Sequence, residues 1–361
     1  MDGRRGGRAG RWRHPDGGRR PGRWRHPDGG RRAGRGVRRA LLVDAGRIDV
    51  VEESLPALGA SDVLVQVAEC GICTSDVDVW LGKTGQQLPL ALGHEAAGVV
   101  LDVGKDVTKI TPGSDVACWV EGGGFSEAVL TQERFCLPVD GAGPHPAVAE
   151  PLSCVVNAVG LAAPQLGDDV VIVGAGFMGN LLQLTVQLRG PRTVTVVDIR
   201  REALDRAASL GATRTVDSSA ENLGEIIAGI TGGRGADVTF EVTGTNEGLG
   251  LAETATRMSG KLAIVGYHQG GTRAIRLGHW NWMAFDIVNA HFRESATILA
   301  GMRTGLRLMS AGKLDVTPLL THFYPLEAID EAFQAAATKP TGFVKAVIRP
   351  NGRQAHPRDT T

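Results

Sequence analysis

The chain has 361 residues, with 42% hydrophobic and 22% charged side chains, and its 39 basic and 39 acidic groups give a net charge of zero. This length and hydrophobic content are sufficient for two buried cores, and 50 glycines with only 5% aromatics are typical of an α/β enzyme. No apolar run reaches the roughly 18 residues that a membrane helix needs, and the first residues lack the apolar core of a secretory signal. We therefore expect a cytoplasmic protein that does not enter a membrane.

The neutral total hides an uneven distribution of charge. Residues 1–36 contain twelve arginines and three aspartates, a net charge of +9, so the rest of the chain carries −9. The segment RWRHPDGGRR occurs at 11–20 and again at 23–32, a repeat too short and too polar to build a folded unit. We expect this tail to be disordered, and binding of nucleic acid through it is the less favoured interpretation. The simpler interpretation is translation from upstream of a true start near Val37; residues 350–361 form a second tail.

Five cysteines stand at positions that do not suggest a disulfide framework. They are odd in number and scattered, which fits a reducing compartment. The five are Cys70, Cys73, Cys118, Cys136 and Cys154. We expect Cys118, Cys136 and Cys154 to be small buried residues.

Short apolar runs with a period near two follow the tail, each closed by glycine, aspartate or proline. This pattern predicts a β-rich first domain. The runs are RRALLV at 38–43, DVLVQVAEC at 62–70, AAGVVLDVG at 96–104 and SDVACWV at 114–120.

After about residue 155 the pattern changes to alternating strands and helices, which predicts a doubly wound parallel sheet. From about residue 300 the chain returns to mixed structure, and this ending could fold back onto the first domain. Predicted strands cover 168–176, 193–198, 236–244, 261–267 and 342–348, and predicted helices cover 179–190, 201–212, 301–312 and 326–337.

The sequence GAGFMG lies directly after an apolar strand and at the start of a helix. Gly174 permits a tight turn, Gly176 lets the backbone approach a pyrophosphate, and Gly179 permits close packing of the helix on the strand. The helix start, with Phe177 and Met178, supplies free N–H donors. The segment is therefore a candidate site for the diphosphate of a dinucleotide.

Asp198 ends the next strand, twenty-four residues after the first glycine of this loop. A carboxylate at this place accepts hydrogen bonds from ribose hydroxyls and repels a 2′-phosphate, so we expect NAD, with NADP less favoured. Arg200 and Arg201 are side chains that a 2′-phosphate would attract, but they also suit a solvated helix start. A comparison of kcat/KM for the two cofactors would decide between them.

Cysteine, histidine and glutamate occur at a spacing that suits a metal. CGICTSD contains Cys70 and Cys73, and LGHEAAG contains His94 and Glu95, with His94 twenty-one residues after Cys73. Thiolate, imidazole and carboxylate suit zinc, and three protein ligands leave the open position that a catalytic zinc needs. The two cysteines alone would also suit a redox pair.

The order of these motifs resembles the zinc-dependent medium-chain dehydrogenase/reductase family. GICTSD, GHEAAGVV, EPLSCVVNAV and then the strand, GxGxxG and helix follow one another as in that family, and the resemblance covers about 38–349. It implies an α/β fold in which a GroES-like β-rich catalytic domain, 37–157 and 296–349, is interrupted by a Rossmann domain, 158–295. The active site is then expected in the cleft between the two domains.

The resemblance also implies roles for single residues. Cys73 and His94 match the zinc ligands of the family. Glu95 and Glu150 stand at two places where the polyol dehydrogenase branch carries carboxylates at the metal or the substrate, and either could complete the site. Ser75 matches the hydroxyl that touches the substrate alcohol and passes its proton outward.

Three further positions follow or depart from the family pattern. Lys345 resembles a basic residue that reaches the cofactor phosphates, with a plain surface lysine as the alternative. Asp78 stands where many relatives have a relay histidine, so the proton exit is expected to differ. The lobe of four cysteines that binds a structural zinc in many relatives is missing after Cys118, so we expect one zinc per subunit.

Together these features predict an alcohol dehydrogenase that transfers a hydride between a secondary alcohol and NAD and gives the ketone. Zinc would polarise the substrate oxygen. Polyols, cyclitols or amino alcohols are the favoured substrates; a simple alcohol dehydrogenase and a zinc-free quinone or enoyl reductase are the alternatives. We expect a homodimer or homotetramer, and we expect neither nucleic acid nor a membrane as a partner.

In residues 278–292, which lead toward a subunit interface in such relatives, Trp280, Asn281 and Trp282 could shape a pocket or simply pack.

Overall fold

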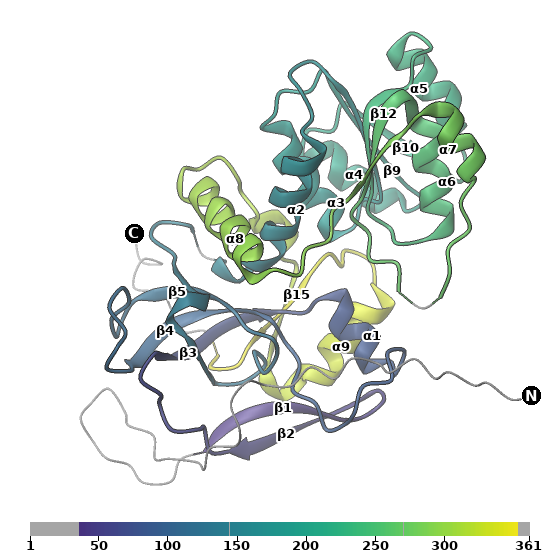
Figure 1. Ribbon diagram of the computed structural model, residues 1–361. Coiled ribbons are helices and arrows are strands. Elements are labelled where there is room, and N and C mark those ends of the chain that lie inside the picture. Colours follow the sequence, from purple (N-terminus) through teal and green to yellow (C-terminus); the bar gives the residue numbers. More distant parts are fainter. Residues whose placement is uncertain (1–35, 144, 270, 353–361) are drawn as a thin grey trace, which may run out of the picture.

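The computed structural model describes residues 36–143, 145–269 and 271–352. The tails expected at 1–36 and 350–361 therefore lie almost wholly outside the described residues. The chain forms a mostly antiparallel sheet and a parallel sheet, with helices around the parallel one (Figure 1). This arrangement confirms the predicted α/β fold with a β-rich part and a doubly wound part. In the described residues, no helix is both long and apolar enough to cross a membrane.

The β-rich part consists of a hairpin and a seven-stranded sheet with the order β14-β15-β3-β4-β5-β7, in which β6 also pairs with β3. Strand β3 lies in the middle of this sheet, where it pairs with β15, β4 and β6. Its Val63, Val65 and Val67 enter one core, while Leu64 enters a second cluster. The hairpin strands are β1 (Val37–Asp44) and β2 (Arg47–Glu53), and the sheet strands are β3 (Asp62–Gly71), β4 (Glu95–Val103), β5 (Asp115–Trp119), β6 (Ala128–Gln132), β7 (Cys136–Pro138), β14 (His322–Pro325) and β15 (Ala346–Arg349).

The end of the chain returns to this first sheet, as the sequence suggested. Strand β15 pairs antiparallel with β3, so that Val347 lies opposite Gly71. Helix α9 (Ile329–Thr338) packs beside α1 (Thr74–Trp80), and the rings of Phe333 and Trp80 are 5.9 Å apart. Residues near the C-terminus therefore help to build the same side of the sheet that carries the cysteine motif (Figure 1).

The second sheet is parallel throughout, with the order β10-β9-β8-β11-β12-β13. Its central strand β8, with the sequence DVVIV, is buried along its whole length. The strands are β8 (Asp169–Val173), β9 (Thr193–Asp198), β10 (Arg214–Asp217), β11 (Ala236–Glu241), β12 (Thr256–Ile264) and β13 (Asp286–Asn289), and the helices are α3 (Phe177–Gln187), α4 (Arg201–Ser209), α5 (Leu223–Thr231), α6 (Asn246–Ala255) and α7 (Leu277–Met283).

Two long helices, α2 (Ala149–Ala162) and α8 (Ser295–Ser310), join the two parts of the molecule. They approach so closely at Gly301 that a β-carbon there would lie only 2.9 Å from the Cα of Ser153, and glycine permits this contact. One core cluster contains Ala97 of β4, Leu152 of α2 and Ile172 of β8, so the hydrophobic core is continuous between the sheets. Helix α2 thus runs through the expected domain boundary at 157/158 and places its first turn beside the β-rich sheet.

Candidate active site

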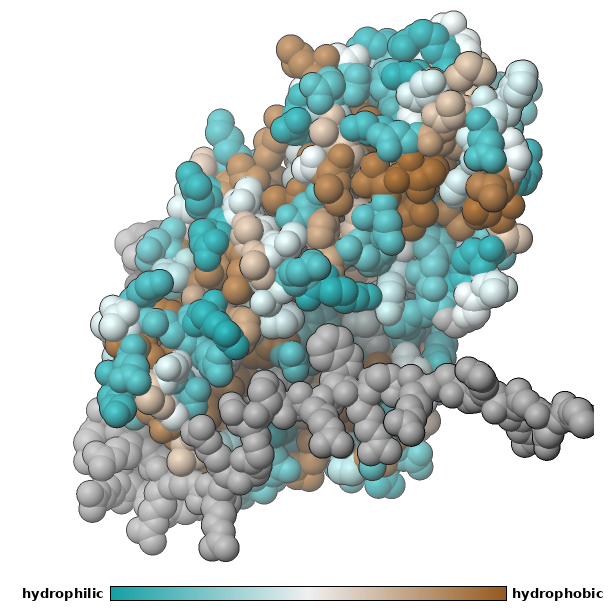
Figure 2. Space-filling view, in the orientation of Figure 1, coloured by the Kyte–Doolittle hydropathy of each residue, from teal (hydrophilic) through white to brown (hydrophobic). Residues whose placement is uncertain are grey.

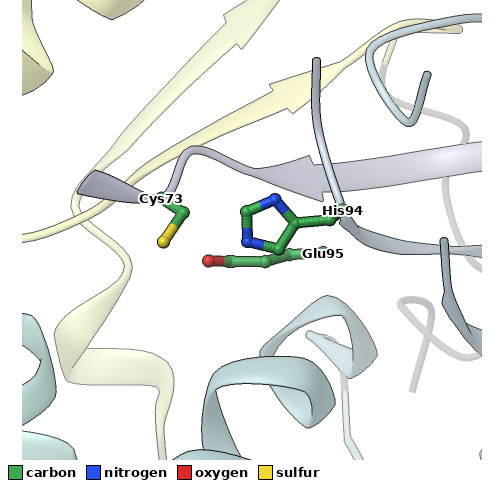
Figure 3. A group of neighbouring side chains, drawn as sticks. All are labelled: Cys73, His94 and Glu95. Atoms are coloured by element: carbon green, nitrogen blue, oxygen red, sulfur yellow. The ribbon is translucent and has the colours of Figure 1, made fainter. Parts of the chain in front are cut away.

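Three predicted ligands come together where β3 ends and β4 begins. Cys73 follows β3 and precedes α1, while His94 and Glu95 stand at the start of β4. The two strands are antiparallel and Gly71 lies opposite Glu95, so these segments are neighbours in space. Figure 3 shows the thiol, the imidazole and the carboxylate converging on one point, and one ligand atom of each lies within 4.8 Å of the others.

This group fits a zinc ion. Glu95 Oε2 is buried and has no hydrogen-bond partner, which is costly unless a cation or donor occupies the space beside it. Sulfur, nitrogen and oxygen are the donor atoms that zinc takes in proteins, and three of them leave one position open. In the part of the chain that the structure describes, no second group of three such side chains lies this close together.

Asp76 holds the imidazole of His94 and the segments around it. Asp76 Oδ1 lies 3.4 Å from His94 Nδ1 and accepts a hydrogen bond from the backbone N–H of Gly93, and Oδ2 accepts one from the backbone N–H of Cys73. Burial acts to raise the pKa of Asp76, but His94 and these backbone donors outweigh it and lower the pKa below its usual value. The ionised carboxylate therefore binds Nδ1 and leaves His94 Nε2 for the metal.

We expect Asp76→Asn to weaken zinc binding about 10- to 100-fold, because it removes the charge that orients His94. The measurement is the zinc dissociation constant from competition with a chelator. Asp78→Asn is the matched control, since Asp78 lies on the same helix but pairs with Lys83 at 2.9 Å, away from His94. Equal loss in the two variants would contradict a specific role for Asp76.

Glu95 is held by Lys345, 250 residues away in the sequence. Lys345 Nζ donates to Glu95 Oε1 at 2.7 Å, and the two side chains are 6% and 2% exposed. Burial acts to lower the pKa of Lys345, but Glu95 outweighs it and raises the pKa, so the ammonium stays charged. A β-carbon at Gly71 would lie 2.0 Å from Glu95 Oε2, so only glycine leaves room for this carboxylate. One oxygen of Glu95 is thus neutralised by Lys345, while the other has no hydrogen-bond partner.

The structure corrects one expectation for Lys345. The alternative of a plain surface lysine is wrong, because the side chain is buried. Its ammonium donates to Glu95 and lies 4.6 Å from the ring centre of Phe177 at the start of α3, and its role at the cofactor phosphates stays a prediction. Lys345 therefore stands between the metal ligands and the glycine-rich loop.

The glycine-rich loop has the geometry that a diphosphate requires. Gly174 has a φ of +109°, which favours glycine, and a β-carbon at Gly179 would lie 1.9 Å from the carbonyl oxygen of Gly174. Space beside Gly176 is open, with no atom within 4 Å of a β-carbon placed there. Phe177 and Met178 form the first turn of α3, which begins without a side-chain cap. The loop can thus bring backbone N–H groups to an anion.

Two domain models match the chain: the alcohol dehydrogenase GroES-like domain over residues 59–141, and the zinc-binding dehydrogenase domain over residues 167–303. The chain belongs to the zinc-dependent medium-chain alcohol and polyol dehydrogenases. It is therefore an oxidoreductase that acts on CH–OH groups and uses zinc and a nicotinamide cofactor.

Relatives of this dehydrogenase cover nearly the whole described chain. Sorbitol dehydrogenase of Ovis aries is 29% identical over 317 residues, which are 78% of this chain and 88% of that protein. L-threonine 3-dehydrogenase of Rhizobium etli is 26% identical over 323 residues, 80% of this chain and 92% of that protein. The structure of a zinc-binding dehydrogenase from Sinorhizobium meliloti, bound to NADP, has a TM-score of 0.79 and 25% identity, with 87% of this chain and 99% of that one covered.

Glu150 of the dehydrogenase lies in the first turn of α2 and outside the group of three ligands. Burial raises its pKa to about 7, while the charge of His94 lowers it and that of Glu95 raises it, so Glu150 lies close enough to the site to interact with these charges. The structure therefore brings Glu95, but not Glu150, into the metal group.

Cys154, which the sequence analysis predicted to be a small buried residue, is only partly buried and lies near the site. It lies one helical turn after Glu150 on α2, and burial raises its pKa to about 12, with Glu150 and Cys73 adding to the effect. The sequence did contain one indication: Cys154 stands four residues after Glu150, which places the two side chains on the same face of a helix. The remaining thiols lie elsewhere: Cys70 is buried outside the metal group, and Cys118 Sγ lies 3.7 Å from Cys136 Sγ in the core.

The residues expected at the nicotinamide end divide into packing and surface positions. Trp280 of α7 is buried and donates a hydrogen bond to Glu253 of α6 at 2.6 Å, so it packs α7 against α6. Trp282 is 76% exposed. Ser75, in contrast, lies half-buried in the first turn of α1, two residues after Cys73.

Proposed function

We propose that this dehydrogenase transfers a hydride between NAD and a secondary alcohol that carries a neighbouring hydroxyl or amino group, and gives the ketone. The observation that supports this proposal most is the carboxylate-containing metal group of Cys73, His94 and Glu95, with Glu150 close enough to interact with its charges. A second polar group on the substrate would give Glu150 a hydrogen-bond donor. The names of the relatives fit, since sorbitol and L-threonine both combine an alcohol with an adjacent polar group.

Each residue then has a task. Cys73, His94 and Glu95 hold the metal, which when bound supplies a Lewis acid for the substrate oxygen. Ser75 Oγ accepts the proton of the substrate hydroxyl. The glycine-rich loop and α3 bind the diphosphate, which fixes the nicotinamide ring relative to the substrate carbon.

The proton then leaves along α1. Asp78 lies three residues after Ser75, on the same face of this helix, and its Oδ1 accepts a hydrogen bond from Lys83 Nζ at 2.9 Å. We propose that Asp78, with a water molecule, takes the place of a relay histidine.

We also propose a homodimer or homotetramer, as expected from the sequence. Strand β13 is the edge of the parallel sheet, and apolar side chains beside it are exposed: Leu277 and Trp282 of α7 and Ile287 of β13. Figure 2 shows hydrophobic residues gathered on this side of the molecule. An unpaired strand edge next to exposed apolar side chains suits a contact with a second copy.

The experiment is a screen of polyols, cyclitols, amino alcohols and simple alcohols with NAD, followed through the absorbance of the reduced cofactor. We expect kcat/KM to be at least about tenfold higher for substrates with a vicinal polar group, a size that one good hydrogen bond accounts for. Metal analysis is expected to find one zinc per subunit. Better turnover of simple primary alcohols would make the protein a simple alcohol dehydrogenase, and full activity without zinc would contradict the mechanism.

A further inference from the structure

A carboxylate outside the metal group lies fully buried at the point where the order of the parallel strands reverses. The order β10-β9-β8-β11-β12-β13 changes direction between β8 and β11, and dinucleotides bind across the carboxyl ends of the strands at such a point. Glu241 is the last residue of β11, and its side chain is buried. The loop after β11 lies beside the nucleotide loop, since a β-carbon at Gly174 would be 3.0 Å from Thr243 Cγ2. Glu241 therefore stands at this crevice, in the second half of the sheet.

The two oxygens of Glu241 hold the loops that follow two neighbouring strands. In the loop after β11, Oε1 accepts hydrogen bonds from the backbone N–H groups of Thr243 at 2.6 Å and Gly244 at 2.9 Å, and from the hydroxyl of Thr243. In the loop after β12, His268 Nε2 lies 2.9 Å from Oε2. A β-carbon at Gly266 would lie 2.7 Å from Oε2, so glycine leaves room for this contact. One buried side chain thus fixes the two loops relative to each other.

Arg273 determines which nitrogen of His268 carries the proton. Arg273 Nε lies 3.2 Å from His268 Nδ1, and because a guanidinium only donates, Nδ1 accepts. The imidazole then carries its proton on Nε2 and donates it to Glu241 Oε2. Arg273 Nη2 also donates to the carbonyl oxygens of Gln269 at 2.6 Å and Gly244 at 3.3 Å. A chain of hydrogen bonds therefore runs from a cation to the buried carboxylate, and it requires an acceptor at both oxygens of Glu241.

We infer that Glu241 is a positioning residue for the nicotinamide half of the cofactor, which it orients through these two loops without touching it. The adenosine half has its own support at the ends of β8 and β9, where Asp198 Oδ2 accepts a hydrogen bond from the backbone N–H of Ala175 at 2.8 Å and Oδ1 pairs with Arg200 Nε at 3.1 Å. Loops that are held in place before binding lose less conformational entropy when the nicotinamide ring binds. The inference rests on the proposed nicotinamide-dependent activity.

Glu241→Gln tests this role, because an amide cannot accept hydrogen bonds on both sides. If the amide oxygen stays with the loop after β11, the NH2 group faces the N–H of His268, and two donors meet. We expect this variant to bind NADH about 10- to 100-fold more weakly, the size of a lost hydrogen bond to a charged group. It should bind ADP-ribose, which lacks the nicotinamide ring, as tightly as the wild type. The measurements are fluorescence titration of the zinc-loaded enzyme with NADH and competition by ADP-ribose.

Glu253→Gln is the matched control, because it also removes a buried carboxylate that accepts hydrogen bonds at both oxygens. Glu253 accepts from Trp280 Nε1 and from Arg276 Nε. It lies near the end of α6 that precedes β12, at the opposite edge of the sheet from Glu241. This variant should keep the wild-type affinities for both nucleotides.

A second pair of variants, His268→Ala and His268→Gln, leaves the buried carboxylate in place. Alanine removes the donor to Glu241 Oε2 and should weaken NADH binding, whereas glutamine restores a donor and should recover most of the affinity. Wild-type affinity for NADH in Glu241→Gln, equal losses of NADH and ADP-ribose in that variant, or equal NADH binding by the two His268 variants would overturn the inference. Turnover with NAD by the wild type in the same preparations distinguishes this failure from failure of the proposed function.

Discussion

Replacing Cys73 with serine is expected to remove the zinc and to lower kcat/KM more than about 100-fold while the fold stays intact. Loss of residues that only orient a ligand costs about 10- to 100-fold, and loss of a thiolate ligand removes the metal–sulfur bond itself. Cys73 is only partly buried and lies at the end of a strand, so the hydroxyl of serine is accommodated without a cavity. Metal content, circular dichroism and steady-state kinetics on one preparation are the measurements.

Cys70→Ala is the control for this variant. Cys70 is three residues earlier and buried in the core outside the metal group, so its loss should leave zinc content and turnover near the wild-type values. A small loss of stability is expected from the cavity. If both variants lost zinc equally, the two cysteines would act as one pair, and the assignment of Cys73 as a single ligand would fail.

Much of the fold could be predicted because its strands are short, apolar and closed by turns. The strands at 62–71 and 169–173 are buried almost throughout, and runs of valine and isoleucine between glycines indicate such strands directly. Helix α2 was not predicted, because most of its side chains are apolar and it shows no polar face. Its available signals were a glutamate and a proline, Glu150 and Pro151, in the first turn. Residues 277–289 were missed as well, since the short helix α7 and strand β13 lie at an exposed edge.

The candidate site was predictable where its residues are close in sequence. Cys73 and the pair of His94 and Glu95 stand at facing ends of two neighbouring strands, so a local motif describes them. The pairing of Lys345 with Glu95 depends on the return of β15 to β3, and no local pattern indicates which buried group a distant lysine meets. The ion pair between Arg200 and Asp198 was also missed, because a carboxylate at a strand end has the same sequence pattern whether it is free or bound.

Lys345→Met is expected to destabilise the metal-free protein by about 3–5 kcal/mol, the cost of leaving one partner of a buried ion pair without compensation. Glu95 is 2% exposed, and in this variant its Oε1 would lose the ammonium while Oε2 already has no partner. Methionine fills a volume similar to the lysine stem, so the loss reports the charge rather than a cavity. Urea unfolding of the metal-free protein gives the free energy of unfolding.

Zinc should change this result in a way that a purely structural lysine would not. A bound divalent cation compensates Glu95 directly, so the difference between Lys345→Met and the wild type is expected to shrink when both are saturated with zinc. In the metal-free protein, the double variant Glu95→Gln/Lys345→Met should recover most of the lost stability, because no uncompensated charge remains. A deficit of the same size with and without zinc would mean that Lys345 stabilises the sheet through packing alone, and that Glu95 does not face the metal.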